Sequence, residues 1–139
     1  MDMSGFLERI EGELYKGNAV VIQGRSGSGK TEILRALRER LDGINILLDM
    51  RYVNGRYGFY EKIRREICSQ TKSCNSLACM DEVIKKGRVN LLLDEYWAGK
   101  SFCDDFLEYA HRYGNKIVTV AGVPRVDSYV EFIIDSVNP

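Results

Sequence analysis

Eight consecutive residues combine glycine, lysine and hydroxyl side chains at a spacing suited to holding phosphate. The segment matches G-x-x-x-x-G-K-[ST] and reads Gly24, Arg25, Ser26, Gly27, Ser28, Gly29, Lys30 and Thr31. Glycines permit a tight loop whose backbone N–H groups point at one phosphate, and a helix beginning near Lys30 adds the positive end of its dipole. We expect Lys30 to reach the β- and γ-phosphates and Thr31 to offer its hydroxyl to Mg²⁺. The alternative is a flexible turn, which so long a match disfavours.

Two adjacent carboxylates form the second group of candidate residues. Asp94 and Glu95 directly follow residues 89–93, an apolar run typical of a buried strand. Because adjacent side chains at a strand end diverge, the two acids can take different roles. We expect Asp94 to hold Mg²⁺ through its water shell and Glu95 to polarise the water that attacks a γ-phosphate. Acids after a strand are common, so this hypothesis gains its weight from the independent phosphate-binding pattern.

Strands and helices alternate along the chain and must position these residues. Apolar, β-branched runs predict strands at 19–23, 44–49, 89–93 and 117–121. Apolar residues at helical spacing predict helices at 6–14, 30–41, around 60–67, 77–86 and 102–112, with loops at 51–58 and 69–76. Such alternation is typical of an α/β fold, here a three-layer α/β/α sandwich with a mainly parallel sheet of four to five strands. Residues 126–137 are compatible with an edge strand or a short helix.

The two motifs together resemble those of a known superfamily. Residues 24–31 look like the Walker A motif of P-loop NTPases, and residues 89–95 look like the Walker B motif. The pair Asp94 and Glu95 resembles the additional-strand, catalytic-glutamate division, which includes AAA+ proteins and archaeal signal-transduction ATPases. This resemblance implies ATP rather than GTP, a Mg²⁺ ion, and a sheet in which the Walker B strand and the fourth strand flank or approach the strand before the loop.

The chain also departs from that family. A polar sensor residue is expected near the end of the fourth strand, where this sequence has Val120, Ala121 and Gly122, and Thr119 comes too early. The segment after Gly122 is too short for the helical lid of the family. We therefore expect residues 1–139 to form a single minimal P-loop NTPase domain without a recognisable C-terminal lid. A fifth strand, if present, must come from residues 130–135.

Phosphoryl transfer usually needs a cation on the developing charge. Arg125 is the leading candidate because it follows the expected ligand edge of the fourth strand. The alternatives are an ordinary exposed role for Arg125 and an arginine supplied by a neighbouring subunit. Arg25 lies inside the phosphate loop, but we expect its side chain to point to solvent.

Residues 51–60 interleave arginine and tyrosine, a composition that can stack on bases and pair with phosphates. Tyrosines packed against helices are the favoured alternative, because twenty Lys+Arg balance twenty Asp+Glu and leave a formal net charge of zero. Nucleic acid is therefore a weakly supported partner. Trp97, the single tryptophan, is predicted to be a partly buried packing residue, and the alternatives are that it covers the nucleotide or contacts a partner.

The composition also bears on the cellular location of the protein and on metal binding by its cysteines and histidine. The longest apolar runs are strand-sized, which excludes a membrane span, and the acidic first residues do not resemble a secretory signal, so we expect a cytoplasmic protein. Four cysteines and one histidine match no zinc-binding spacing. Ordinary thiols are favoured, and a disulfide between Cys74 and Cys79 is left open.

The motifs, with ATP as the nucleotide that the resemblance implies, thus predict Mg²⁺-dependent ATP binding and ATP hydrolysis. In this hypothesis Lys30, Glu95 and Arg125 are catalytic, residues 24–31 bind the nucleotide, and Thr31 with Asp94 holds the metal. One alternative is a non-hydrolysing regulatory or assembly module that binds nucleotide. A small-molecule kinase is less favoured, since an acid pair follows the third strand and no arginine-rich lid segment is present. Expected partners are ATP or ADP and a second copy of the chain or another protein.

Overall fold

The computed structural model describes residues 2–73 and 75–135. Five strands form one all-parallel sheet in the order β2-β3-β4-β1-β5. They are β1 (Ala19–Gly24), β2 (Ile44–Asp49), β3 (Val89–Asp94), β4 (Lys116–Val120) and β5 (Tyr129–Ile134). The predicted α/β class is confirmed. Helices connect β1 to β2, β2 to β3 and β3 to β4, whereas residues 121–128 connect β4 to β5 without a helix.

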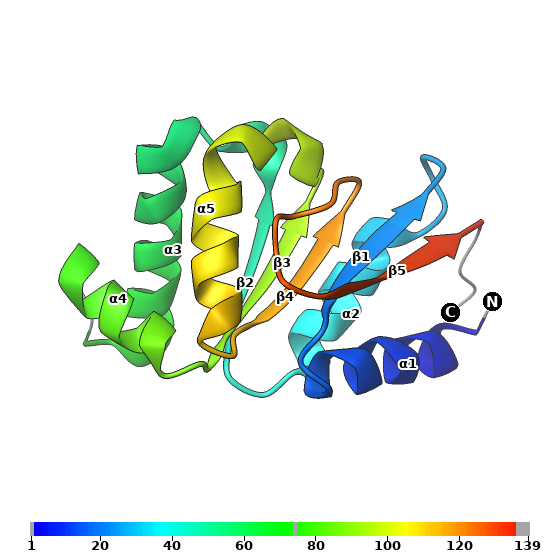
Figure 1. The fold of residues 1–139 in the computed structure, drawn as a ribbon, viewed down its shortest axis with the longest axis horizontal. Helices are drawn as coiled ribbons and strands as arrows, with labels where there is room; N and C mark the ends of the chain where they lie inside the picture. Colours follow the sequence, from blue (N-terminus) through cyan, green and yellow to red (C-terminus); the bar gives the residue numbers. More distant parts are fainter. Residues whose placement is uncertain (1, 74, 136–139) are drawn as a thin grey trace.

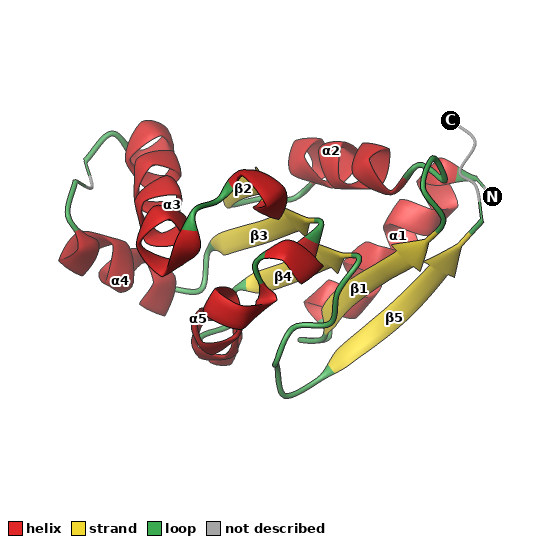
Figure 2. Cartoon of the chain, turned by 90° about the horizontal axis from the view of Figure 1, so that it is seen from above, coloured by secondary structure: helices red, strands yellow, loops and turns green. Residues whose placement is uncertain are grey.

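Helices cover both faces of the sheet and give it three layers (Figures 1 and 2). One face carries α1 (Met3–Tyr15) and α2 (Lys30–Arg40). The other carries α3 (Gly55–Thr71), α4 (Leu77–Lys85) and α5 (Lys100–Arg112). Two short 3₁₀ turns, η1 (Met50–Tyr52) and η2 (Tyr96–Ala98), follow β2 and β3 and contact each other.

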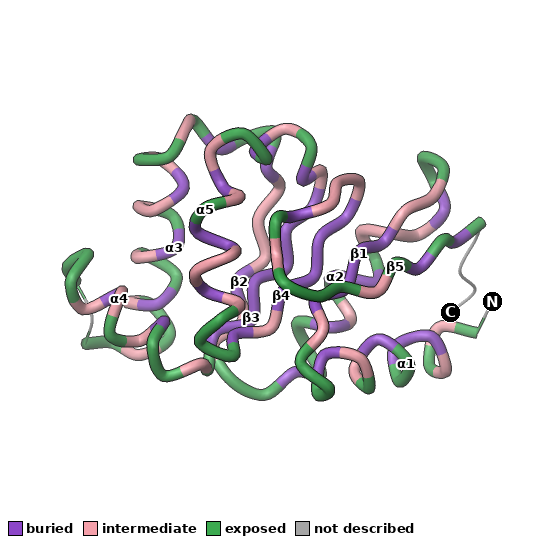
Figure 3. The backbone as a smooth tube through the Cα atoms, in the orientation of Figure 1, coloured by how far each residue is buried: buried purple, intermediate pink, exposed green. Residues whose placement is uncertain are grey.

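The apolar strand β3 separates two hydrophobic cores. Leu91 and Leu93 pack toward α3 and α5, whereas Leu92 packs toward α2, and all three are fully buried. Successive side chains of a strand point to opposite faces, so an unbroken apolar run suits a strand covered on both sides. The buried backbone in Figure 3 is concentrated along β1, β3 and β4. The strands that precede the candidate residues are therefore the most fully buried part of the sheet.

The structure corrects several details of the predicted elements. Residues 129–134 form β5, so the ambiguous C-terminal segment contains a strand rather than a helix. β2 lies at a sheet edge and is only partly buried, although the sequence predicted a fully buried strand. Helix α3 begins at Gly55, inside the predicted loop 51–58, and extends to Thr71, into the predicted connection 69–76. Helix α5 begins at Lys100, two residues earlier than expected.

Within residues 2–73 and 75–135, no helix combines the length and apolar character needed to cross a bilayer. Cys68 and Cys103 are free thiols. The open question of a disulfide between Cys74 and Cys79 involves Cys74, which lies outside the described residues.

Candidate functional site

The carboxyl ends of β1, β3 and β4 meet at one edge of the sheet, and the phosphate-binding candidate follows β1 at that edge (Figure 1). β4 pairs with both β1 and β3 and therefore separates them by one strand. In open parallel sheets, ligands bind outside the carboxyl ends of the strands. The topology thus brings two motifs that are far apart in sequence to the same edge.

Glycine is required at two positions of the loop after β1. Gly29 ends the loop with φ = 100°, a left-handed conformation that side chains disfavour, and it caps α2 without a side-chain hydrogen bond. A Cβ on Gly24 would lie 2.4 Å from the Ile134 carbonyl oxygen of β5. Because Gly29 offers no capping side chain, the first N–H groups of α2 are available to an anion.

Thr31 and Asp94 are joined directly. Thr31 Oγ1 donates a hydrogen bond of 2.8 Å to Asp94 Oδ2, although the residues are 63 positions apart. Asp94 is only 6% exposed, and its second oxygen, Oδ1, accepts a 3.0 Å hydrogen bond from the Glu95 backbone N–H. Each carboxylate oxygen of Asp94 therefore accepts a hydrogen bond, one from each of the two motifs. The structure thus brings the two predicted metal-binding residues together.

Lys30 lies back over the loop that precedes it. Its Nζ donates to the backbone carbonyl of Gly24 and, at 3.1 Å, to that of Arg25. The ammonium group is thereby held at the centre of the loop by two neutral acceptors. Neither acceptor is a carboxylate, so no ion pair has to break when Lys30 turns to an anion.

Glu95 occupies a strained backbone conformation at the start of η2. Its φ of 51° lies in the left-handed region, which costs a non-glycine residue about 1–2 kcal/mol. Ala121, at the end of β4, has a φ of 60°. Both residues contribute to the same cavity. Such strain is concentrated at functional sites, where the surrounding structure fixes it.

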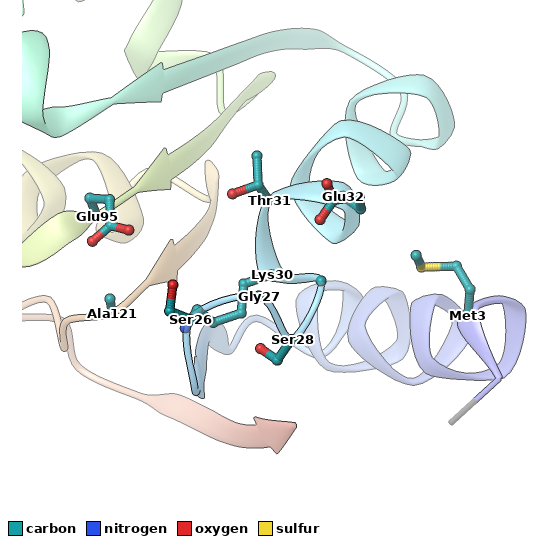
Figure 4. Close-up of a pocket in the computed structure, with 10 residues that line it drawn as sticks. Met3, Ser26, Gly27, Ser28, Lys30, Thr31, Glu32, Glu95 and Ala121 are labelled. Atoms are coloured by element: carbon teal, nitrogen blue, oxygen red, sulfur yellow. The ribbon is translucent and has the colours of Figure 1, made fainter. Parts of the chain in front are cut away.

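A cavity of about 630 Å³ opens beside the loop. Figure 4 shows the side chains around it, which come from α1, the loop, the first turn of α2 and the ends of β3 and β4. The lining residues are Met3, Ser26, Gly27, Ser28, Gly29, Lys30, Thr31, Glu32, Glu95 and Ala121. The cavity has room for a ligand of nucleotide size, since small-molecule sites commonly occupy about 300–1,000 Å³.

Ser28 gives an independent test of whether the loop suits a phosphate. Ser28 is 3% exposed. Among the buried side-chain oxygen and nitrogen atoms of residues 2–73 and 75–135, its Oγ alone has no hydrogen-bond partner. An unsatisfied buried hydroxyl costs about 1–3 kcal/mol. A phosphate oxygen in the adjacent cavity would satisfy it, and the donors Lys30 and Thr31 line the same cavity. The residues present therefore fit a phosphate group.

The predicted residues do not all line the cavity. The residues from Ser26 to Thr31 and Glu95 do so, whereas Asp94 lies behind Thr31 and Arg25 is exposed, as expected. Arg125 is not among the lining residues and pairs with Asp105 and Glu108 of α5. The structure thus gathers the metal and phosphate candidates but ties Arg125 to a neighbouring helix, and its catalytic role stays a prediction.

The sequence did not reveal three of the lining residues, Met3, Glu32 and Ala121. The prediction of a packing role for Trp97, which is not a lining residue, was also wrong. Met3 and Ala121 reach the cavity from α1 and from the end of β4, and an apolar side chain carries no motif that would reveal this. Trp97 is 59% exposed rather than partly buried packing, and its indole Nε1 donates a 2.5 Å hydrogen bond to Glu95 Oε2. The sequence offered one sign of this contact, namely that Trp97 comes two residues after Glu95.

The segment rich in arginine and tyrosine has both exposed and packed residues. Tyr52 and Tyr57 are more than two-thirds exposed, whereas Tyr60 packs against Phe106. Arg51 forms two side-chain hydrogen bonds to Asp49, and these raise the pKa of its guanidinium. An acid thus neutralises Arg51 locally, and nucleic-acid binding stays a prediction.

A scan against protein-family models finds no match to this chain, and neither does a search of the curated proteins. In the described part of the chain, no group of three His, Cys, Asp or Glu side chains could hold a metal ion. A cation at this site would therefore take the Thr31 hydroxyl, the Asp94 carboxylate, water and ligand oxygens, a donor set that suits Mg²⁺.

Proposed function

We propose that the protein binds ATP together with Mg²⁺ and hydrolyses it. The observation that carries this proposal is the 2.8 Å hydrogen bond between Thr31 and Asp94. It unites a phosphate-binding loop and an acidic strand end at one cavity, and Glu95 lines that cavity as well. The strand order supports the proposal, because β4 is the neighbour of β1 and β3 lies one strand further, so both approach the strand before the loop, as the resemblance to the additional-strand division implies.

The loop residues would bind the phosphates. Backbone N–H groups at the start of α2 and the Ser28 hydroxyl donate to phosphate oxygens, and Lys30 supplies a positive charge. To reach a phosphate, Lys30 gives up its hydrogen bonds to Gly24 and Arg25, which are bonds to neutral carbonyl groups. A charge-assisted bond to phosphate is stronger than either of them.

Thr31 and Asp94 would hold the metal, Thr31 through its hydroxyl and Asp94 through water. When bound, Mg²⁺ neutralises charge on the β- and γ-phosphate oxygens. Glu95, which comes next in the chain but diverges from Asp94, would orient a water molecule and accept its proton as the water attacks the γ-phosphate. The acid that holds the metal and the acid that activates water are thereby kept apart.

The experiment is Mg²⁺-dependent phosphate release from ATP, measured over a range of protein concentrations for the wild type and Glu95→Gln. We expect release by the wild type, loss of release in the variant, and retained ATP binding in both. A rise in specific activity with protein concentration would show that assembly completes the site. Equal turnover in the two proteins would contradict the assignment of Glu95.

A second candidate is a nucleotide-binding module that does not turn ATP over by itself. One observation favours it: in the described part of the chain, the cavity lining includes no arginine, and Arg125 pairs with acids of α5. Without a cation on the developing charge, hydrolysis loses about 10³–10⁵ in rate. ATP binding without phosphate release at any protein concentration would favour this candidate.

A further inference from the structure

We propose that Trp97 is a positioning residue whose indole N–H fixes the orientation of the Glu95 carboxylate at the cavity. The inference rests on the proposed function, in which Glu95 activates water. The contact that carries it is the 2.5 Å hydrogen bond from Trp97 Nε1 to Glu95 Oε2. A hydrogen bond to a carboxylate at this distance is charge-assisted and stronger than a bond between neutral groups. It leaves Oε1 as the oxygen that can accept a proton from water.

The backbone of Trp97 is anchored to the two strands that bound the site. Its N–H donates to the Ala121 carbonyl at 3.1 Å, and the Ala121 N–H donates to the Ile22 carbonyl of β1 at 3.0 Å. A Cβ on Gly122 would lie 2.8 Å from the Trp97 nitrogen, so this close approach requires glycine. The indole therefore extends from a base that is fixed relative to the phosphate-binding loop.

The backbone of Glu95 is fixed as well, but its side chain is not. Its N–H is held by Asp94 Oδ1, and its left-handed φ sets the direction in which the side chain leaves the chain. A glutamate side chain has several rotatable bonds beyond that point, and fixing it requires a contact near the carboxylate. The Trp97 indole N–H provides this contact.

A role in core packing does not account for Trp97. The side chain is 59% exposed, and burial of its ring adds little to the core. Its one polar atom is nevertheless placed on a carboxylate that lines the cavity.

The first test detects the contact without any enzymatic activity. Because Trp97 is the single tryptophan, ¹⁵N-labelled protein gives one indole N–H signal. We expect this signal to move upfield in Glu95→Ala as the charge-assisted bond is lost. Glu32→Gln is the matched control, since it removes another carboxylate of the cavity, one that pairs with Arg35 at 4.0 Å. An indole signal that does not move in Glu95→Ala would overturn the proposal.

The second test is kinetic and uses Trp97→Phe, which keeps an aromatic ring and removes the N–H donor. We expect kcat to fall about 10- to 100-fold with KM unchanged, because misorientation of a catalytic group acts on the chemical step. Tyr15→Phe, at a tyrosine that is 65% exposed, is the control and should keep the wild-type kcat. The Tm of each variant is measured as well. If a fall in kcat/KM were caused only by misfolding, the Tm of that variant would also be lower.

The outcomes separate the two proposals. If the wild type hydrolyses ATP and Trp97→Phe has the same kcat, the positioning role is wrong and the proposed function stands. If the wild type releases no phosphate at any protein concentration, the proposed hydrolysis is wrong, and so is the positioning role of Trp97 in it. This holds even if the indole signal shows that the hydrogen bond between Trp97 and Glu95 exists. A lower kcat in Trp97→Phe, with unchanged Tm and ATP affinity, supports both.

Discussion

Thr31 Oγ1 donates a 2.8 Å hydrogen bond to Asp94 Oδ2 across 63 positions of sequence. Asp94 is buried to 6% exposure, and its other oxygen accepts from the Glu95 N–H. Loss of a donor to a buried carboxylate lowers the free energy of unfolding. This contact therefore links the stability of the fold to the arrangement of the candidate site.

Replacement of Thr31 by valine removes the hydroxyl from this contact. We expect a loss of about 1–3 kcal/mol in the free energy of unfolding, measured with urea, because a buried acceptor is left unsatisfied. Thr31→Ser keeps the hydroxyl and should retain most of the stability and the Mg²⁺ dependence of ATP binding. Equal stability of wild type and Thr31→Val would show that the hydrogen bond contributes nothing.

Replacement of Lys30 by alanine tests the phosphate-binding loop. We expect ATP affinity, measured by calorimetry, to fall about 10- to 100-fold, since a hydrogen bond to a charged group contributes about 1.5–3 kcal/mol. Arg38→Ala, at an exposed position late in α2, is the matched control for the loss of one positive charge and should bind as the wild type does. Unchanged affinity in Lys30→Ala would contradict the assignment of the loop.

Gly24 is placed so close to β5 that a side chain cannot be added without movement. A Cβ would lie 2.4 Å from the Ile134 carbonyl oxygen, and Gly24→Ala should therefore lower the free energy of unfolding by about 1–3 kcal/mol. Gly12→Ala is the control, because nothing lies within 4 Å of a Cβ at this helical position. That substitution should stabilise the protein by about 0.5–1 kcal/mol. Similar urea midpoints for the two variants would refute the close approach.

The hydrogen bond between Tyr109 of α5 and Asp81 of α4 predicts that the stability of the fold depends on pH. Tyr109 Oη donates a 2.5 Å hydrogen bond to Asp81 Oδ1, and this bond holds the pKa of Asp81 below its ordinary value of 3.8. A carboxyl with a lowered folded-state pKa adds stability above the unfolded pKa and loses it as the pH falls through the folded value. The wild type should therefore lose more stability than Tyr109→Phe between pH 5 and about pH 3. Parallel pH profiles of Tm would exclude this coupling.

Cys103 should be chemically inert in the folded protein. Burial raises the pKa of its thiol to about 12, and the residue is fully buried. The reactive thiolate is therefore scarce at pH 8. In a time course with iodoacetamide followed by mass spectrometry, we expect the half-buried Cys68 to be labelled before Cys103, and both to be labelled in urea. Rapid labelling of Cys103 without denaturant would be inconsistent with its burial.

Features that depend on a few neighbouring residues could be predicted from the sequence. The loop from Gly24 to Thr31 is predicted to bind phosphate because glycine, lysine and a hydroxyl must stand at fixed spacing to surround one. The strand before Asp94 was recognised because burial on both faces demands an unbroken apolar run. Both lie where the pattern placed them, and both contribute to one site.

Features that depend on distant partners were decided only by the tertiary structure. The edge position of β2 and the placement of β4 beside β1 follow from strand pairing, which local composition does not encode. Arg125 pairs with acids of α5, and Trp97 reaches Glu95 because η2 is held by the end of β4. The sequence by itself determined which groups can do chemistry, since this is a property of side chains and their local spacing. The fold decided which of them meet, since contacts between remote segments depend on how the whole chain packs.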